Sequence, residues 1–376
     1  MTRTRARALL TALLLIGIQV TWIAVPAYAC GCGAMIPRTG HQVTVTAETS
    51  AIAWDGRTEQ IVMRLSLTGD SKDAAWIMPV PHRATAELGD PALFSALTEE
   101  TAPAHRTRHH FWPRGDDWPF GGDTDTSGDA ALPGATADPG VHVVGRQRLG
   151  PFDVARLTAT DPTALADWLK DNGFKLPARL ENALRPYVDQ GWEYVAIRLA
   201  PADDAKPLAG QLDPLHLTFA SDRLVYPMRL SQLAASAQHL NLYVLAAHRM
   251  EPRSAIGGST PKVTFAGDLG TLPPGPLAEL AGDTRYLTAI DQDFWRPQEI
   301  GGDHELRRAA HDTPYREVVY KDELLTVGPD LPVWLLTVLG ALTAGVSAAL
   351  LRARAHRRRP IVPPPPVTVP PPLGRP

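Results

Sequence analysis

Two cysteines, Cys30 and Cys32, stand one residue apart and are the only cysteines in the 376-residue chain. In an oxidising compartment such a pair can close a local disulfide, whose very small ring would be strained and easily reduced. Three other roles stay open: a redox-active or intermolecular thiol pair, lipidation of Cys30, and a soft metal such as Cu(I) or Zn²⁺. No other cofactor is predicted.

An aspartate-rich segment, DTDTSGD at 123–129, resembles the start of a calcium-binding loop. Asp123, Asp125, Ser127 and Asp129 match the first half of the EF-hand pattern. The twelfth position, which needs a bidentate Glu, is Gly134, and no amphipathic helices flank the segment. Calcium binding by these four residues is therefore only a minor alternative.

Two of the nine tryptophans, Trp112 and Trp118, fall in the Gly-, Pro- and Asp-rich segment 102–140. This composition predicts a long exposed loop. Most other tryptophans lie inside regular elements, where core packing explains them. Trp112 and Trp118 are therefore the predicted binding contacts of an exposed loop.

The N-terminus has the layout of a secretory signal peptide. Three arginines precede a largely apolar stretch at 8–25, and Ala27-Tyr28-Ala29 forms a small-x-small cleavage site. We expect residues 1–29 to be removed, which makes Cys30 the first residue of the mature chain.

The C-terminal part has the layout of a single membrane anchor. Residues 331–351 carry no charge and are long enough to cross the hydrocarbon core as a helix. The following RARAHRRR predicts a cytoplasmic side, so the protein is expected to be single-pass type I in the cell membrane. The basic, Pro-rich tail at 352–376 is expected to be an extended spacer, with a ligand for a Pro-binding module as the alternative.

Charge is distributed unevenly along the chain. The leader holds three of the 37 Lys and Arg and the tail six, while all 40 Asp and Glu lie between, so the middle carries 28 bases and a net charge of −12. Nucleic-acid binding depends on phosphate neutralisation, so this acidic domain is predicted to bind none.

The elements that would position these residues are mainly strands. EQIVMRLSLTGD at 59–70 alternates with period two, and Asp55-Gly56 before it is a hairpin signal. Helices are predicted at 90–100, 161–173 and 176–191. The sequence therefore predicts an α+β fold, mainly antiparallel sheet with a few short helices, plus one C-terminal transmembrane helix. Further strands are predicted at 74–81, 192–200, 215–220 and 240–247.

Several short motifs occur in a characteristic order: ACGCGA at 29–34, AWIMPVP at 75–81, GPFDV at 150–154, DWLKDNGF at 167–174, GWEYVAIRL at 191–199 and YLT at 286–288. Their order and spacing resemble the bacterial family called domain of unknown function 2330, over roughly residues 29–320. The resemblance implies an extracytoplasmic domain with no established activity, and it supplies no catalytic residues.

The domain organisation and function follow from these observations as expectations. Residues 30–320 form the extracytoplasmic domain and 321–330 a juxtamembrane stalk. The expected function is a non-enzymatic binding or scaffold module of the cell envelope, with the membrane and an unknown envelope protein or ligand as partners. The alternative is an envelope thiol redox or metal-handling protein that uses Cys30 and Cys32.

Overall fold

The structure is a computed structural model that describes residues 29–30, 33–114, 117, 148–149, 152–157, 162–199, 207–328 and 331–357. The chain divides into two compact units. The first comprises the chain up to Ala104 together with Asp138–Glu317, and the second comprises His105–Ala137 and Val318–Pro376. Each unit is described by itself.

Two large sheets form the first unit. The six-stranded sheet has the order β1-β2-β5-β10-β9-β8, and all its pairings are antiparallel. Strand β5 is buried along its whole length because it is covered on both faces. The strands of this sheet are β1 (Ala29–Cys30), β2 (Gly33–Pro37), β5 (Ala74–Val80), β8 (Arg148–Leu149), β9 (Phe152–Leu157) and β10 (Glu193–Leu199).

The larger sheet has the order β19-β16-β17-β14-β3-β4-β12-β6, with β11 also paired to β4. Its pairings are antiparallel except that of β14 with β3, which is parallel. Its strands are β3 (Val43–Trp54), β4 (Thr58–Gly69), β6 (Thr85–Leu88), β11 (Gly210–Gln211), β12 (Leu215–Ala220), β14 (Gln238–Ala246), β16 (Lys262–Asp268), β17 (Tyr286–Phe294) and β19 (Tyr315–Arg316).

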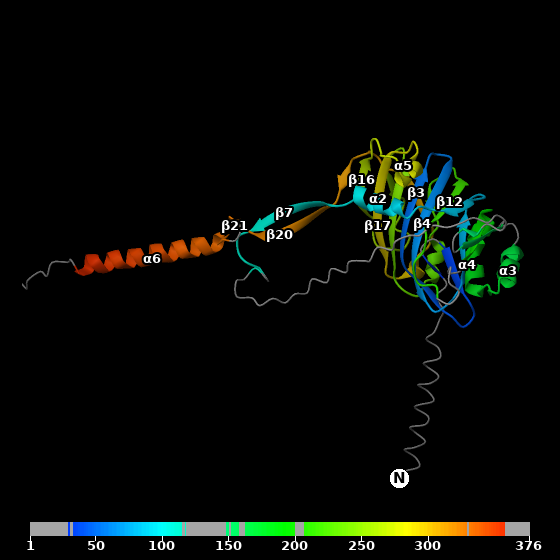
Figure 1. The fold of residues 1–376 in the computed structure, drawn as a ribbon, viewed down its shortest axis with the longest axis horizontal. Coiled ribbons are helices and arrows are strands. Elements are labelled where there is room, and N and C mark those ends of the chain that lie inside the picture. Colours follow the sequence, from blue (N-terminus) through cyan, green and yellow to red (C-terminus); the bar gives the residue numbers. More distant parts are fainter. Residues whose placement is uncertain are drawn as a thin grey trace, which may run out of the picture. The chain divides into compact units, whose positions relative to one another are not determined.

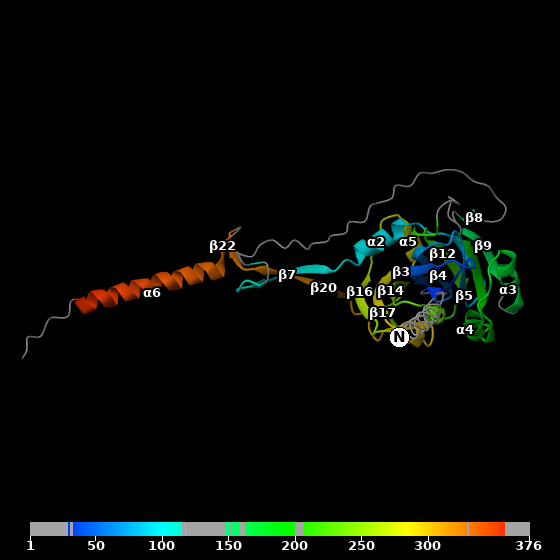
Figure 2. The ribbon, with the colours of Figure 1, turned by 90° about the horizontal axis from the view of Figure 1, so that it is seen from below.

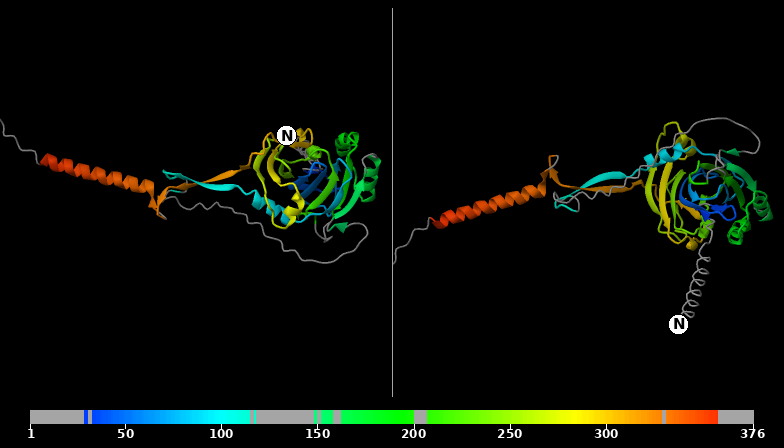
Figure 3. Two further views of the ribbon diagram at one scale, coloured as in Figure 1. Left: turned by 90° about the horizontal axis from the view of Figure 1, so that it is seen from above. Right: turned by 60° about the horizontal axis from the view of Figure 1, so that its bottom comes forward.

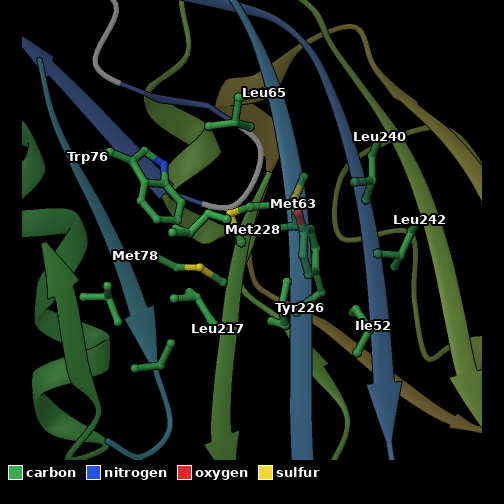
Figure 4. Close-up of a cluster of buried hydrophobic side chains, with 14 of the residues drawn as sticks. Ile52, Met63, Leu65, Trp76, Met78, Leu217, Tyr226, Met228, Leu240 and Leu242 are labelled. Atoms are coloured by element: carbon green, nitrogen blue, oxygen red, sulfur yellow. The ribbon is translucent and has the colours of Figure 1, made fainter. Parts of the chain in front are cut away.

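The main hydrophobic core lies between the two sheets (Figure 4). Alternation along each strand decides which side chains enter it: Trp76 and Met78 of β5 point into this core, whereas Ala75 and Ile77 face the opposite side. The five methionines after the initiator, all buried, belong to the main core: Met35, Met63, Met78, Met228 and Met250.

Helices cover the outer face of each sheet in the first unit (Figures 1 and 2). On the six-stranded sheet, α3 (Pro162–Asp171) and α4 (Ala178–Asp189) enclose a second core. On the larger sheet, α2 (Ala92–Glu100) and α5 (Pro276–Ala281) enclose a third. The first unit is therefore a sandwich of two sheets with helices outside both, and Figure 3 shows the sheets from two further directions.

A small three-stranded sheet completes the first unit, in the order β13-β18-β15. Two 3₁₀ turns lie in the same region and approach each other. These elements carry the candidate site described below. They are β13 (Val225–Tyr226), β15 (Met250–Pro252), β18 (His304–Arg308), η2 (Arg229–Leu233) and η3 (Pro297–Glu299).

The second unit contains paired strands and one long helix. Strand β7 (Ala104–His110) pairs with β20 (Val318–Leu324), and β21 (Thr326–Val327) pairs with β22 (Leu331–Pro332). Helix α6 (Val333–Arg357) follows, and its length and apolar composition are sufficient to cross a membrane.

The predicted α+β fold with mainly antiparallel sheet is confirmed, as are several individual elements. Strand β4 occupies the predicted alternating segment, and Ile61, Met63, Leu65 and Leu67 all point into the main core. The Asp55-Gly56 turn is also present: Asp55 Oδ1 accepts hydrogen bonds from the amides of Arg57 and Thr58, and Gly56 has φ +97°. Part of the segment predicted to be an exposed loop, residues 104–110, forms strand β7 instead.

Candidate functional site

A cleft of about 300 Å³ opens beside the small three-stranded sheet. It is the size of a small-molecule site and combines apolar walls with convergent charges. We call it the arginine cleft after Arg223, Arg229 and Arg253, which line it together with Trp192, Val225 and Ile256. Two acids, Asp303 and Glu305, complete the charged lining.

Asp303 is the best-anchored group in the arginine cleft. Its Oδ1 accepts hydrogen bonds from the hydroxyl of Tyr187 at 2.5 Å and from the amides of Met228 and Arg229 at 2.8 and 2.9 Å. Its side chain is only 10% exposed. The Tyr187 pKa lies well above its usual value, first because the hydroxyl is buried and then because the charge of Asp303 is adjacent. Tyr187 therefore stays protonated and donates to a fixed carboxylate.

Arg229 supplies hydrogen-bond donors that the described protein groups do not use. Its Nε lies 3.8 Å from Asp303 Oδ2, too far for a hydrogen bond. This nitrogen is buried and has no hydrogen-bond partner among the described residues. A buried donor without a hydrogen bond is costly, and Nε is offset only by its ion pair with Asp303. The rest of the side chain is partly exposed and lines the cleft, where an entering acceptor can reach it.

Strand pairing places the other two arginines on either side of Glu305. Glu305 lies opposite Val225 on β13, and Arg253, just after β15, donates its amide to the Glu305 carbonyl at 2.9 Å. Glu305 then pairs with the Arg223 guanidinium at 3.3 Å and with that of Arg253 at 3.5 Å. One carboxylate thus shares two partly exposed guanidinium groups, which retain free donors toward the cleft.

The segment after β15 has an unusual backbone where it borders the cleft. Ile256 has φ +46°, the only positive value at a non-glycine residue in the described chain. Such a conformation is a genuine outlier for a β-branched residue and concentrates at functional sites. Gly257 follows with φ +100°, and a Cβ at this position would collide with the carbonyl oxygen of Glu299. The segment is therefore held in a strained conformation by its contact with η3.

His304, between the two cleft acids, faces the protein interior. It is 1% exposed, its Nδ1 has no hydrogen-bond partner among the described residues, and its ring lies 6.2 Å from that of Phe294. Burial lowers the pKa of His304 to about 4, so the imidazole is neutral at physiological pH. His304 therefore adds no positive charge beside Asp303.

A second, more open hollow of about 660 Å³ is lined by Arg38, Lys72, Asp73 and Arg198. Arg38 binds both oxygens of Asp73 at 2.6 Å, and Arg198 donates to Asp73 Oδ2 at 2.9 Å. Burial raises the pKa of Asp73, but the bonds from Arg38 and Arg198 outweigh it and the net pKa is lowered. Because Asp73 already engages both guanidinium groups, the arginine cleft is the better candidate for an added ligand.

Most residues singled out from sequence lie outside the described part of the structure. This applies to Cys32, to the side chain of Cys30, to Trp118, and to Asp123, Asp125, Ser127 and Asp129. Disulfide, redox, metal and calcium roles for these residues stay predictions. Within the described ranges, no group of three or more His, Cys, Asp and Glu side chains is arranged to hold a metal ion.

Trp112 is described, and it follows strand β7 in the second unit, 60% exposed. Its ring contacts those of Phe111 and Trp334, with centroids 5.1 and 6.5 Å away. Trp334 belongs to the first turn of α6. Trp112 is thus part of an aromatic group at the start of the apolar helix.

Sequence reasoning missed the arginine cleft. Arg223, Arg229 and Arg253 are separated from Asp303 by 50 to 80 residues in the sequence. The one local signal is Gly301-Gly302-Asp303 directly before a strand. Two glycines allow the backbone to pass close to other groups, and a carboxylate follows them. Nothing in the sequence indicates that η2 brings Arg229 to this aspartate.

Comparison with known families identifies a match over residues 26–307 to the bacterial family described as uncharacterised protein conserved in bacteria, domain of unknown function 2330. The chain belongs to this family. The resemblance found in the sequence motifs is therefore confirmed, and the arginine cleft lies within the matched region. A search of curated proteins found no match.

Solved structures to which the chain is weakly similar include the following two. Baculovirus P35 aligns with 9% identity and a TM-score of 0.31, over 71% of this chain and 97% of that one. A chain of the caspase-8/P35 complex aligns with 6% identity and a TM-score of 0.28, over 70% of this chain and 94% of that one. Scores this low carry no conclusion about fold or function.

Proposed function

We propose that the protein is a membrane-anchored, extracytoplasmic binding module of the cell envelope, without enzymatic activity, that takes an oxyanion group in its arginine cleft. Family membership and the apolar helix α6 support the location. The observation that carries the ligand class is the partly exposed Arg229 side chain, which lines the cleft beside two further arginines and makes no hydrogen bond through Nε among the described residues.

The chemistry of the cleft favours a carboxylate or a phosphate. A guanidinium presents donors in a planar fork that matches two oxygens of such a group. Asp303 competes only in part, because its Oδ1 is filled by three donors and its Oδ2 forms an ion pair with Arg229 Nε at 3.8 Å that is too long for a hydrogen bond. Trp192, Val225 and Ile256 add apolar surface for the remainder of the ligand.

The test uses the full chain in lipid nanodiscs, with inorganic phosphate and succinate as probes in isothermal titration calorimetry. We expect at least one probe to bind and the Arg229→Gln variant to lose at least tenfold in affinity, which corresponds to about 1.4 kcal/mol. Arg307→Gln is the matched control, because Arg307 is exposed and pairs with Glu251 outside the cleft. Equal binding by wild type and Arg229→Gln, or no binding of either probe, would contradict the proposal.

The alternative, a thiol redox or metal-handling protein, retains one supporting observation. Strand β1 ends at Cys30, is paired with β2, and lies beside β3 and η2. The backbone of Cys30 therefore belongs to the six-stranded sheet. Intact mass with and without reduction and thiol alkylation distinguishes a bridge from free thiols, and Cys32→Ser would abolish redox cycling while leaving the fold intact.

A further inference from the structure

The start of helix α6 is linked through Leu325 to strand β7, more than 200 residues earlier in the sequence. The amide of Leu325 donates to the carbonyl of His110, and the amide of Val333 donates to that of Leu325, both at 2.9 Å. Figures 1 and 2 show β7 beside β20, with α6 following. Within the second unit, the end of β7 and the first residue of α6 are therefore held close together.

In both strands the charged residues are followed by apolar residues at this end, although Val319 and Tyr320 at the start of β20 are exposed apolar residues too. Strand β7 is exposed and polar through His105, Arg106, Arg108 and His109, after which Phe111 and Trp112 follow. On β20, Lys321, Asp322 and Glu323 precede Leu324 and Leu325. Arg108 binds Asp322 through both oxygens, at 2.6 and 2.8 Å, which ties the polar parts together. The charged part of the ribbon thus ends where this second group of apolar side chains begins.

The apolar side chains at this boundary are unusually exposed. Trp112 is 60% exposed, and Val327 and Leu331 are 55% and 56% exposed. The backbone of Trp112 is also held in place, because Nδ1 of the nearly buried His110 donates a hydrogen bond to the Trp112 carbonyl at 2.8 Å. A cluster of this kind is unfavourable in water but suits the boundary between lipid and water, where Trp places its ring in the headgroup region.

The length of α6 sets where that boundary lies. The apolar residues 333–351 span roughly 28 Å as a helix, close to the ~30 Å hydrocarbon core. Arg352, Arg354 and Arg357 occupy the far end, and Trp334 the first turn. When α6 spans a bilayer, Trp334 lies at the outer interface, and the Trp112 ring in contact with it reaches the same depth.

We infer that Phe111, Trp112 and Trp334 form a membrane-interface anchor, in which the end of β7 inserts its aromatic rings among the lipid headgroups beside the membrane-spanning helix. The inference rests on the proposed membrane anchoring. It assigns Trp112 a lipid surface as its partner and gives the second unit two chain segments at the bilayer.

The experiment measures the depth of individual tryptophans in the full chain. The protein is labelled with 5-fluorotryptophan and reconstituted in phosphatidylcholine nanodiscs. Single Trp→Phe substitutions at 112, 334 and 295 assign the fluorine resonances. Trp295 is the matched control, because it is 70% exposed but belongs to the first unit. Lipids with a nitroxide at acyl position 5 then broaden the resonances of rings at the interface.

We expect Trp112 and Trp334 to lose several-fold more signal than Trp295, while a water-soluble gadolinium chelate gives the reverse order. Broadening of Trp334 without Trp112 would overturn the interface anchor and leave the proposed membrane anchoring intact. Broadening of neither ring would overturn both, because α6 would then not cross the bilayer at the expected depth.

Discussion

At the scale of single residues, the arginine cleft depends on a few groups whose charge is set by burial. Asp303 is held in a fixed position by three donors to its Oδ1. His304 is kept neutral by the apolar core behind it. Asp303 directly precedes β18 and His304 is its first residue, so two adjacent residues at the start of a strand have opposite environments, as expected where successive side chains point to opposite faces.

Because His304 is buried as a neutral imidazole, we predict that acid destabilises the protein. The unfolded imidazole titrates near pH 6.5 and the folded one at about 4, so between these values only the unfolded state binds the proton. Stability contributed by the neutral ring is complete above pH 6.5 and is lost as the pH falls toward 4. The loss between pH 7 and pH 5 should be about 2 kcal/mol.

The variant His304→Leu should remove this part of the pH dependence, as measured by denaturant unfolding at pH 7 and pH 5. His82→Gln is the control, because His82 is exposed and should leave the dependence unchanged. Glu59 has the opposite effect on the free energy of unfolding. Burial raises its pKa, so its ionisation as the pH rises disfavours the folded state. If His304→Leu lost as much stability between pH 7 and pH 5 as the wild type, the assignment of this pH dependence to His304 would be wrong.

At the scale of elements, the cleft depends on the strained segment between β15 and β16. Its geometry requires a residue without a Cβ at 257, because of the positive φ and the close Glu299 carbonyl. The same contact holds Ile256 in its unfavourable conformation, which is compatible with a segment shaped for binding rather than for stability.

We predict that Gly257→Ala destabilises the protein by at least ~2 kcal/mol, because the added methyl meets backbone and cannot be relieved by a side-chain rotation. Gly301→Ala is the matched control. Gly301 also lines the cleft, but its φ is not positive and a Cβ there meets nothing within 4 Å. Denaturant unfolding measures both variants, and equal stabilities would show that the segment adapts without strain.

At the scale of the whole molecule, membrane topology decides which side of the membrane the arginine cleft faces. The charge pattern predicts an outward domain, since the arginines after residue 351 resist translocation. An outward, acidic domain would repel phosphate-rich polymers at long range, while the local excess of arginine in the cleft attracts a small oxyanion.

Protease protection checks this topology. In intact spheroplasts, we expect added protease to reach the domain but not an epitope tag placed after residue 376. Permeabilised cells are the control, and there the tag should be lost as well. Loss of the tag in intact cells would reverse the predicted orientation and place the arginine cleft in the cytoplasm.

The sequence by itself determined the local features of this protein. Period-two alternation located β4 and β10, and an apolar run ended by prolines located β5. Start and stop signals located α2, α3 and α4, because all these patterns follow from backbone geometry within each segment. Collinear motifs identified the family, and the length of the uncharged segment indicated α6.

Tertiary structure alone decided the contacts between distant segments. It paired β14 in parallel with β3, joined β7 to β20, and gathered Arg223, Arg229 and Arg253 around Asp303 and Glu305. It also placed Trp112 against Trp334. The physical reason is that local patterns fix which face of an element is buried, whereas the partner on that face is chosen by packing of the whole sandwich.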